Sequence, residues 1–293
     1  MSRPENLGTD PGHLRERQYK DPGNLEARMA LHARYVRASQ PWHRWLVGRI
    51  DWPEGARVLE VGCGTGALWV RAAPVLPHLR LTLTDLSPGM VGAATEALRP
   101  LERIELVDAR TADVQDLPFE AGAFDVVVAN HMLYHLPDLE RAVAELARVL
   151  DPAGVLLAAT NGAHHLDIVA DLSRDALGWS SSDFVARRFG KENGAAVLGV
   201  AFGSVEWHEH PSTMVVTDPA DVEAYINSST PAQTASPEAR AALHAAVEER
   251  FRAAGGSLEV RTEAGCFVAR SPGRPPEVPS QDPARPGAAA TRR

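Results

Sequence analysis

The stretch Arg57-Val58-Leu59-Glu60-Val61-Gly62-Cys63-Gly64-Thr65-Gly66 decides the fold. An apolar run ends in three glycines at alternate positions, and Ala67-Leu68-Trp69-Val70 follows, which can begin a helix. This pattern predicts a buried strand, a tight turn and a helix. Glycine permits positive φ and a close approach of the backbone to a ligand, and the amides at the start of a helix favour a polar or anionic ligand. The spacing differs from the dinucleotide pattern G-x-G-x-x-G, and the Lys-Ser/Thr of a phosphate loop is missing.

Three further segments end in polar residues. The run 79–85 reads as a second strand that ends in Asp85, and an acid at this place in nucleotide-binding α/β units accepts hydrogen bonds from ribose hydroxyls. The loop 111–119 carries Asp113, and the run 124–131 reads as a strand that ends in Asn130 and His131. The four segments together predict one ligand site at the carboxyl edge of a parallel sheet.

In this order, the four segments resemble the class I S-adenosylmethionine-dependent methyltransferases, in particular the small-molecule branch called type 11. The resemblance covers roughly residues 49 to 160 and is weaker at either end of the chain. It implies an α/β fold with a Rossmann-like, mostly parallel seven-stranded sheet, helices on both faces and a helical cap or insert. It also implies the cofactor S-adenosyl-L-methionine, with S-adenosyl-L-homocysteine as the product.

The resemblance assigns roles to particular residues. The glycines would seat the methionyl part of the cofactor, Glu60 would orient its amino group, and Asp85 would bind the ribose. Asp113 would accept from the adenine amine, with the amide of Val114 facing a ring nitrogen. The full set expected at the cofactor is Tyr19, Glu60, Gly62, Cys63, Gly64, Gly66, Asp85, Leu86, Met90, Asp113, Val114, Asn130 and His131.

Candidates for a general base lie at or just after the sheet's carboxyl edge. His131 and His135 have side chains that titrate near neutral pH, although a structural role for either is an open alternative. Asp167 and Asp171, with His164 and His165, follow the fifth strand and are candidates for contacts with the acceptor. Tyr19, His32, Tyr35, Trp42 and Trp45 either cover the cofactor or only pack the N-terminal helices together.

Composition narrows the function classes. The formal net charge of −8 argues against a general nucleic-acid-binding protein, and no run approaches 18 apolar residues. Cys63 and Cys266 are read as free thiols in a reducing compartment, and the beginning of the sequence lacks an apolar signal region. We therefore expect a cytoplasmic location. We expect no metal, because His131 and His135 lack a third ligand nearby in sequence.

Five regions are expected along the chain. Residues 1–48 form an N-terminal helical lid, of which 1–20 are flexible unless they fold over a ligand, and helix 24–47 breaks near Pro41. Residues 49–160 form the cofactor-binding core, 161–202 a helical substrate insert, and 203–270 complete the sheet with helices, with 258–269 as its last element. Residues 271–293 are rich in Pro, Ala and Arg and form a disordered tail.

The expected function is in-line transfer of a methyl group to an O, C or N atom of a small acceptor, with a secondary metabolite favoured. The expected state is a monomer or a homodimer, without nucleic-acid or membrane partners. Two alternatives stay open: a methyltransferase for tRNA or protein, and an enzyme of the same fold that does not methylate and uses the sulfonium as a cyclisation substrate.

Overall fold

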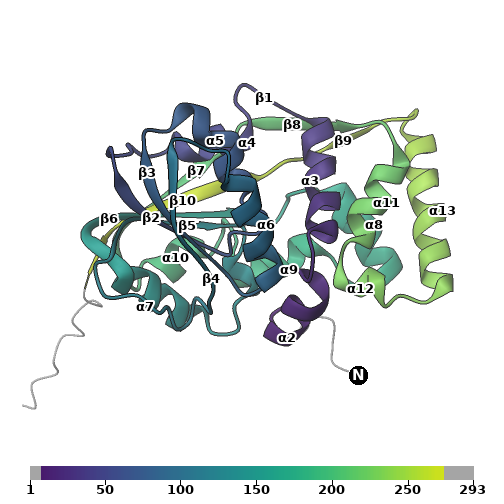
Figure 1. Ribbon diagram of the computed structural model, residues 1–293. Coiled ribbons are helices and arrows are strands. Elements are labelled where there is room, and N and C mark those ends of the chain that lie inside the picture. The colour runs from purple at the N-terminus through teal and green to yellow at the C-terminus, as the bar shows by residue number, and fades with distance from the viewer. Residues whose placement is uncertain (1–7, 274–293) are drawn as a thin grey trace, which may run out of the picture.

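The structure is a computed structural model that describes residues 8–273 (Figure 1). Its centre is a seven-stranded sheet with the order β4-β3-β2-β5-β6-β10-β7. All neighbouring pairs from β4 to β6 are parallel, whereas β10 runs antiparallel to β6 and β7. The prediction of a mostly parallel seven-stranded sheet is confirmed. The strands are β2 (Ala56–Val61), β3 (Leu79–Asp85), β4 (Ile104–Thr111), β5 (Phe124–Asn130), β6 (Leu150–Asn161), β7 (Phe202–Glu209) and β10 (Ala264–Pro272).

Helices cover both faces of this sheet because alternate residues of each strand point to opposite sides. On one face Val58 belongs to a core that includes residues of α4 (Trp42–Val47), α5 (Ala67–Ala72) and α6 (Pro88–Leu98). On the other face Leu59 and Val61 belong to a core with residues of α7 (Leu139–Val149) and α10 (Gly194–Leu198). Short 3-10 turns at η2 (Ala73–Val75) and η3 (Leu133–His135) connect these elements.

The strand order reverses beside β2. From β2 the chain adds β3 and β4 on one side, and then returns to place β5 on the other. In open α/β sheets this reversal leaves a crevice at the carboxyl ends of the strands. The glycine turn after β2, Asp85 at the end of β3 and Asn130 at the end of β5 all lie at this position.

The N-terminal part of the chain differs from the expectation. Residues 1–7 lie outside the described residues, but part of the segment expected to be flexible is helical, in α2 (Pro11–His13) and the π-helix η1 (Leu14–Gln18). The helix expected over 24–47 is α3 (Gly23–Tyr35), followed by β1 (Val36–Ala38) and α4. It ends before Pro41 because residues 36–38 are extended and pair with another strand.

That partner belongs to a second, three-stranded sheet with the order β1-β8-β9, formed with β8 (Ser212–Val216) and β9 (Leu258–Val260). The single sheet element expected over 258–269 is therefore wrong. It divides into β9 and β10, which belong to different sheets, because the backbone at 261–263 turns to hydrogen-bond with residues 162 and 166. The tail expected after 271 lies outside the described residues from 274 onward.

A group of helices packs beside the second sheet around a third core that includes Leu31, Met214 and Val247. Figure 1 shows α3 between the large sheet on one side and α8, α11 and α13 on the other. The helices of this part are α8 (Asp167–Leu177), α9 (Ser181–Phe189), α11 (Pro219–Asn227), α12 (Thr230–Gln233) and α13 (Pro237–Ala253). Within residues 8–273, no helix has both the length and the apolar character that crossing a membrane requires.

Candidate active site

A cavity of about 660 Å³ lies at the carboxyl ends of β2, β3 and β5, and the N-terminal helices and the segments around α8–α11 provide its other walls. The structure brings nearly all residues expected at the cofactor to this one cavity. The lining residues among them are Tyr19, Glu60, Gly62, Cys63, Gly64, Asp85, Leu86, Met90, Asp113, Val114, Asn130 and His131. Of the expected set, Gly66 alone is absent from the lining.

The glycine turn has the positive φ angles that its sequence predicts. They are 63° at Gly62, 53° at Gly64 and 71° at Gly66. A Cβ atom on Gly62 would lie 2.9 Å from two side-chain carbons of Met132, and one on Gly66 would lie 2.6 Å from Cδ1 of Leu98. Both distances are shorter than carbon atoms tolerate. Gly62 thus allows Met132 to pack closely against the turn, whereas Gly66 allows α5 to pack against α6.

Asp85 organises the turn around it. Its carboxylate accepts hydrogen bonds from the amides of Gly64, at 3.0 Å, and Ser87, at 2.9 Å. Burial raises the pKa of this carboxyl group, and the backbone amides oppose that shift. In the loop after β4, Asp113 accepts from the amide of Gln115 at 2.9 Å. The two acids lie at neighbouring strand ends, because Asp85 pairs with Thr111 at the end of β4 and the amide of Ala112 donates to the carbonyl of Asp85 at 3.1 Å.

Glu60 is buried at the end of β2, where it lines the cavity. Its Oε2 accepts from the indole nitrogen of Trp69 at 2.6 Å, and burial raises the pKa of its carboxyl group to about 8. A cationic ligand group beside this buried carboxyl group would favour its ionised form. Burial also raises the pKa of the Cys63 thiol, so this cysteine stays protonated and acts as part of the wall.

A chain of hydrogen bonds joins Arg28, Tyr19 and His135 across the cavity. Nδ1 of His135 lies 2.8 Å from the carbonyl oxygen of Gly8, which can only accept, so Nδ1 donates. In the neutral ring Nε2 then accepts from the Tyr19 hydroxyl at 2.9 Å, and Nη1 of Arg28 donates to the same hydroxyl at 3.2 Å. Burial lowers the pKa of His135 to about 4. The tautomer of His135 and the direction of the Tyr19 hydroxyl are thus fixed.

His131 has a different environment. Its backbone lies in the left-handed region with φ of 57°. This conformation is uncommon for residues other than glycine, and such residues cluster at functional sites. Its ring lies 5.1 Å from that of Trp42, and burial lowers its pKa to about 3. Beside it, Oδ1 of Asn130 is buried without a hydrogen-bond partner among the described residues. A ligand amine or hydroxyl in the cavity would satisfy that oxygen.

Comparisons with known proteins agree with this geometry. Residues 59–158 match the model of the family described as "Methyltransferase domain". This segment is a methyltransferase domain. It contains the glycine turn, both acids of the β3–β4 edge and the segment from β5 to His135.

Curated proteins are similar to part of the chain. A malonyl-[acyl-carrier protein] O-methyltransferase of Geobacter sulfurreducens is 42% identical over 110 residues, which are 37% of this chain and 40% of that protein. A trans-aconitate 2-methyltransferase of Variovorax paradoxus is 36% identical over 132 residues, 45% of this chain and 49% of that protein. The chain thus spans less than half the length of the curated relatives it matches.

Solved structures share the fold over more of the chain. A phosphoethanolamine N-methyltransferase 2 of Haemonchus contortus in complex with S-adenosyl-L-methionine has a TM-score of 0.54 and 19% identity, covering 93% of this chain and 61% of that one. The [4+2]-cyclase SpnF has a TM-score of 0.51 and 21% identity, covering 81% and 85%. At these identities the likeness shows the fold of the methyltransferase domain and its surroundings.

Asp167 and Asp171, which were expected near the acceptor, lie outside the lining of this cavity. Asp171 lies on the exposed side of α8 and pairs with Arg174 at 2.7 Å, and the Asp167 carboxylate accepts from the amide of Ile168 at 2.8 Å. The expectation that these acids face the acceptor is corrected here. His165, two residues before Asp167, does line the cavity, whereas His164 does not.

Arg28 and His210 are among the lining residues that the sequence interpretation missed. Arg28 lies one turn before His32 on the face of α3 that carries Leu25 and Met29, so the helical spacing contained a signal for it. His210 follows β7 and donates from Nε2 to the carbonyl of Gln40 at 2.9 Å. No sequence pattern joins it to the N-terminal segment. Of the expected lid residues, Tyr19, His32 and Trp42 line the cavity, and Tyr35 and Trp45 do not.

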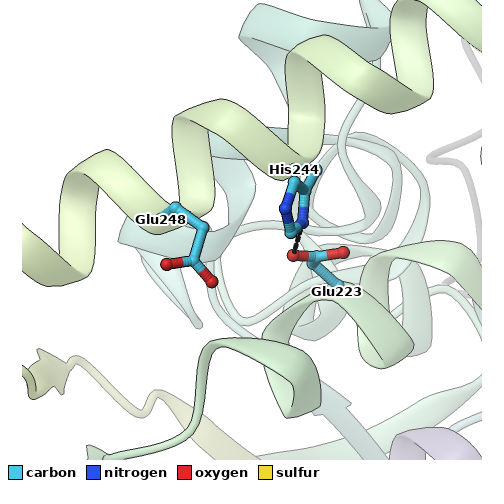
Figure 2. Close-up of side chains that lie close together, drawn as sticks. All are labelled: Glu223, His244 and Glu248. Atoms are coloured by element: carbon cyan, nitrogen blue, oxygen red, sulfur yellow. Dashed lines mark hydrogen bonds and ion pairs between the residues drawn. The ribbon is translucent and has the colours of Figure 1, made fainter.

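Among the described residues, one group has donor atoms close enough for a metal ion, and it lies outside the cavity. Glu223 on α11 and His244 and Glu248 on α13 have ligand atoms within 4.8 Å of one another. Figure 2 shows His244 bonded to Glu223, with Glu248 one turn along the helix; Nδ1 lies 2.7 Å from Oε1. The Glu223 carboxylate raises the pKa of His244. His244 and Glu248 are exposed, and an ion pair suffices to explain the arrangement.

Proposed function

We propose that the chain is an S-adenosyl-L-methionine-dependent methyltransferase that acts on a small molecule. The observation that carries the proposal is the meeting, in one cavity, of the Gly62–Gly64 turn with Glu60, Asp85 and Asp113. A larger side chain at Gly62 would collide with the wall, and Glu60 is a buried carboxyl group suited to a cationic ligand. The methyltransferase domain match supports the same conclusion.

The residues fit this cofactor. We propose that the turn seats its methionyl part, Glu60 its ammonium group, Asp85 its ribose hydroxyls and Asp113 with Val114 its adenine. When bound, the cofactor supplies a methyl group on a sulfonium, an electrophile already activated by its charge. The protein's own task is then to hold the acceptor atom in line and to exclude water.

We assign the removal of the acceptor's proton to Tyr19 and His135. An acceptor hydroxyl would give its proton to the Tyr19 oxygen as the Tyr19 proton passes to Nε2 of His135. The resulting imidazolium keeps its Nδ1–H on the carbonyl of Gly8, and Arg28 stabilises negative charge on the phenol oxygen during the transfer. Neither His131 nor His135 needs to touch the acceptor in this scheme. The protein contributes to catalysis by positioning the acceptor and by relaying its proton through Tyr19 to His135.

The experiment is to incubate the protein with S-adenosyl-L-methionine and a panel of phenols, carboxylic acids and amines, and to quantify both possible products. S-adenosylhomocysteine together with a methylated acceptor is the expected result. Methylthioadenosine, or tight cofactor binding without methyl transfer to any small acceptor, would instead favour the non-methylating alternative. Transfer to tRNA or protein alone would favour the macromolecular one.

Several finer points remain proposals of the same kind. They are the acceptor atom, a role in secondary metabolism, a monomeric or homodimeric state, the absence of nucleic-acid partners and a cytoplasmic location. The cavity supports a small acceptor, because its 660 Å³ must hold the cofactor as well. A typical ligand pocket has roughly 300–1,000 Å³.

A further inference from the structure

Charge is divided unevenly over the cavity wall. Among the described lining residues, the carboxylates are Glu60, Asp85 and Asp113, and all three lie at or just beyond the ends of the strands. The wall formed by the N-terminal helices and the helical part carries no carboxylate among its described residues. It carries Arg15, Arg28 and the histidines His32, His43, His165 and His210, and His131 and His135 follow β5 beside it.

Two histidines of this wall, His32 and His165, form a neutral hydrogen-bonded pair. Nδ1 of His32 lies 3.0 Å from the carbonyl oxygen of Arg28 and must donate, while Nδ1 of His165 accepts from the amide of Glu263 at 3.0 Å. The bond of 3.3 Å between their two Nε2 atoms therefore runs from His165 to His32. Both rings are neutral in this arrangement, and burial lowers the pKa of each.

Arg28 is, together with the exposed Arg15, a permanent charge of this wall. Its Nε donates to the hydroxyl of Ser228 at 3.0 Å, Nη2 to the carbonyl of Ser228 at 3.2 Å and Nη1 to the hydroxyl of Tyr19 at 3.2 Å. A guanidinium has five N–H donors, so one on each terminal nitrogen remains without an acceptor among the described residues. No carboxylate of residues 8–273 pairs with this cation, although burial works against its charge and the tyrosines around it raise its pKa.

The other arginines at the cavity differ from Arg28 in this respect. Arg15 pairs with Glu16 at 2.8 Å and is exposed. Arg71 is also exposed and belongs to α5, which follows the glycine turn. Arg28 alone combines partial burial, fixed orientation by two elements and two free donors. Paired donors of a planar guanidinium match the two oxygens of a carboxylate or phosphate.

We infer that Arg28 binds an anionic group, a carboxylate or a phosphate, on the methyl acceptor. This inference rests on the proposed methyltransferase function and narrows its substrate class to acids. The anion would receive the two free N–H donors, and the neutral histidines and aromatic rings of the same wall would enclose the rest of the molecule. An acceptor held as a cation would meet an uncompensated guanidinium and be rejected.

The inference can be tested with the full chain saturated with S-adenosylhomocysteine, because the acceptor itself is not needed. Binding of benzoate, phenyl phosphate and inorganic phosphate is measured by calorimetry at constant ionic strength, with benzamide as the neutral isostere. We expect the anions to bind the complex and benzamide to bind at least about tenfold more weakly, the scale of a hydrogen bond to a charged group. Benzoate and phenyl phosphate distinguish a carboxylate from a phosphate site.

Variants then locate the binding to the guanidinium. Arg28→Gln should lose anion affinity by about tenfold or more, and Arg28→Lys should retain part of it as a point charge. Arg17→Gln, which removes the same charge from an exposed position of η1 outside the cavity lining, should leave anion affinity unchanged. Circular dichroism establishes that each variant is folded, and the lysine variant keeps the test valid if the glutamine variant is not.

Three results would overturn the inference. Equal affinity for benzoate and benzamide would remove the anion preference, and unchanged anion affinity in both Arg28 variants would place the site elsewhere. Loss of S-adenosylhomocysteine affinity in Arg28→Gln, with anion binding intact, would assign the guanidinium to the cofactor's own carboxylate. Failure of the wild-type protein to bind S-adenosylhomocysteine is a separate outcome, which would refute the proposed function itself.

Discussion

The hydroxyl of Tyr19 lies 2.9 Å from Nε2 of His135, a residue 116 positions further along the chain. One partner comes from the end of the π-helix η1 and the other from the 3-10 turn after β5. The contact therefore exists only when the N-terminal segment lies over the end of the sheet. The N-terminal segment that covers the cavity therefore also supplies Tyr19, which we propose takes the acceptor's proton and passes its own to His135.

Replacing either member of this pair should reduce turnover with little change in cofactor affinity. Tyr19→Phe removes the hydroxyl, and His135→Asn removes the proton-accepting nitrogen, so each should lower kcat by about 10²–10⁴-fold if the acceptor must lose a proton. Steady-state rates and calorimetry with S-adenosylhomocysteine separate the two quantities. Tyr35→Phe is the matched control, since its hydroxyl donates to Asp221 outside the cavity lining. Near-normal turnover in both variants would contradict the proton relay, and positioning of the acceptor alone would then account for catalysis.

Asp85 should govern cofactor affinity. Asp85→Ala removes the acceptor of two backbone amides and, as we propose, of the ribose hydroxyls, so it should weaken S-adenosylhomocysteine binding by about 1.5–3 kcal/mol. Asp108→Ala on β4, where the half-buried carboxylate pairs with Arg110 outside the cavity lining, should have no such effect. Calorimetry that gives the same affinity for Asp85→Ala and wild type would refute the ribose assignment.

Glu60 should make the stability of the ligand-free protein depend on pH. Burial raises its pKa from 4.5 to about 8, so the folded protein holds a proton that the unfolded chain has already lost between these values. The free energy of unfolding should therefore fall as pH rises from about 4.5 to about 8 and level off above that. Glu60→Gln keeps an acceptor for Trp69 and should flatten this slope, with its largest relative stabilisation above pH 8.

Urea unfolding at several pH values between 5 and 9 checks this prediction. The exposed Glu259→Gln on β9 serves as the control, because it removes the same formal charge without burial. Parallel pH profiles for Glu60→Gln and wild type would show that Glu60 does not carry the effect.

Alanine variants at two glycines with the same φ can separate the free-energy cost of backbone strain from the cost of a close contact. Gly66 and Gly122 both have φ of 71°, but an added Cβ meets Leu98 at 2.6 Å in the first case and nothing within 4 Å in the second. Alanine at either site should cost about 1–2 kcal/mol for the left-handed conformation. Gly66→Ala should cost about 1–3 kcal/mol more through overpacking, as denaturant unfolding can measure. Equal losses would contradict the packing role of Gly66.

Metal removal should leave methyl transfer intact. The Glu223–His244–Glu248 group is apart from the cavity lining, and both ring nitrogens of His135 are engaged by Tyr19 and Gly8. Turnover measured after dialysis against EDTA should match that of the untreated protein. Loss of turnover that one divalent ion restores would contradict the proposed site.

The sequence was sufficient to predict the central sheet, because each of its first strands ends in a recognisable turn or polar residue. Strand β2 ends in glycines, β3 in Asp85 and β5 in Asn130, and apolar runs precede each of them. Parallel strands buried on both faces leave such continuous runs. The residues that line the cavity at the ends of these strands could therefore be named from the sequence.

The remaining parts depend on contacts that leave no local pattern. Strand β1 has three residues, too few for a periodic signal, and exists because β8 pairs with it. The order of residues after β6 likewise could not reveal which of them faces the cavity. Leu166 adopts a left-handed φ of 55° just before α8, and after it the helix carries Asp171 to the exposed surface while His165 stays inside.

The pairing of β1 with β8 sets the order in which the cavity can be completed while the chain is being synthesised. The glycine turn and Asp85 leave the ribosome early, when residues 36–38 still have no partner strand. Only after residues 212–216 have emerged can α3 be anchored between the large sheet and the later helices. The edge that we propose binds the cofactor therefore lacks this part of its enclosure until residues 212–216 have been synthesised.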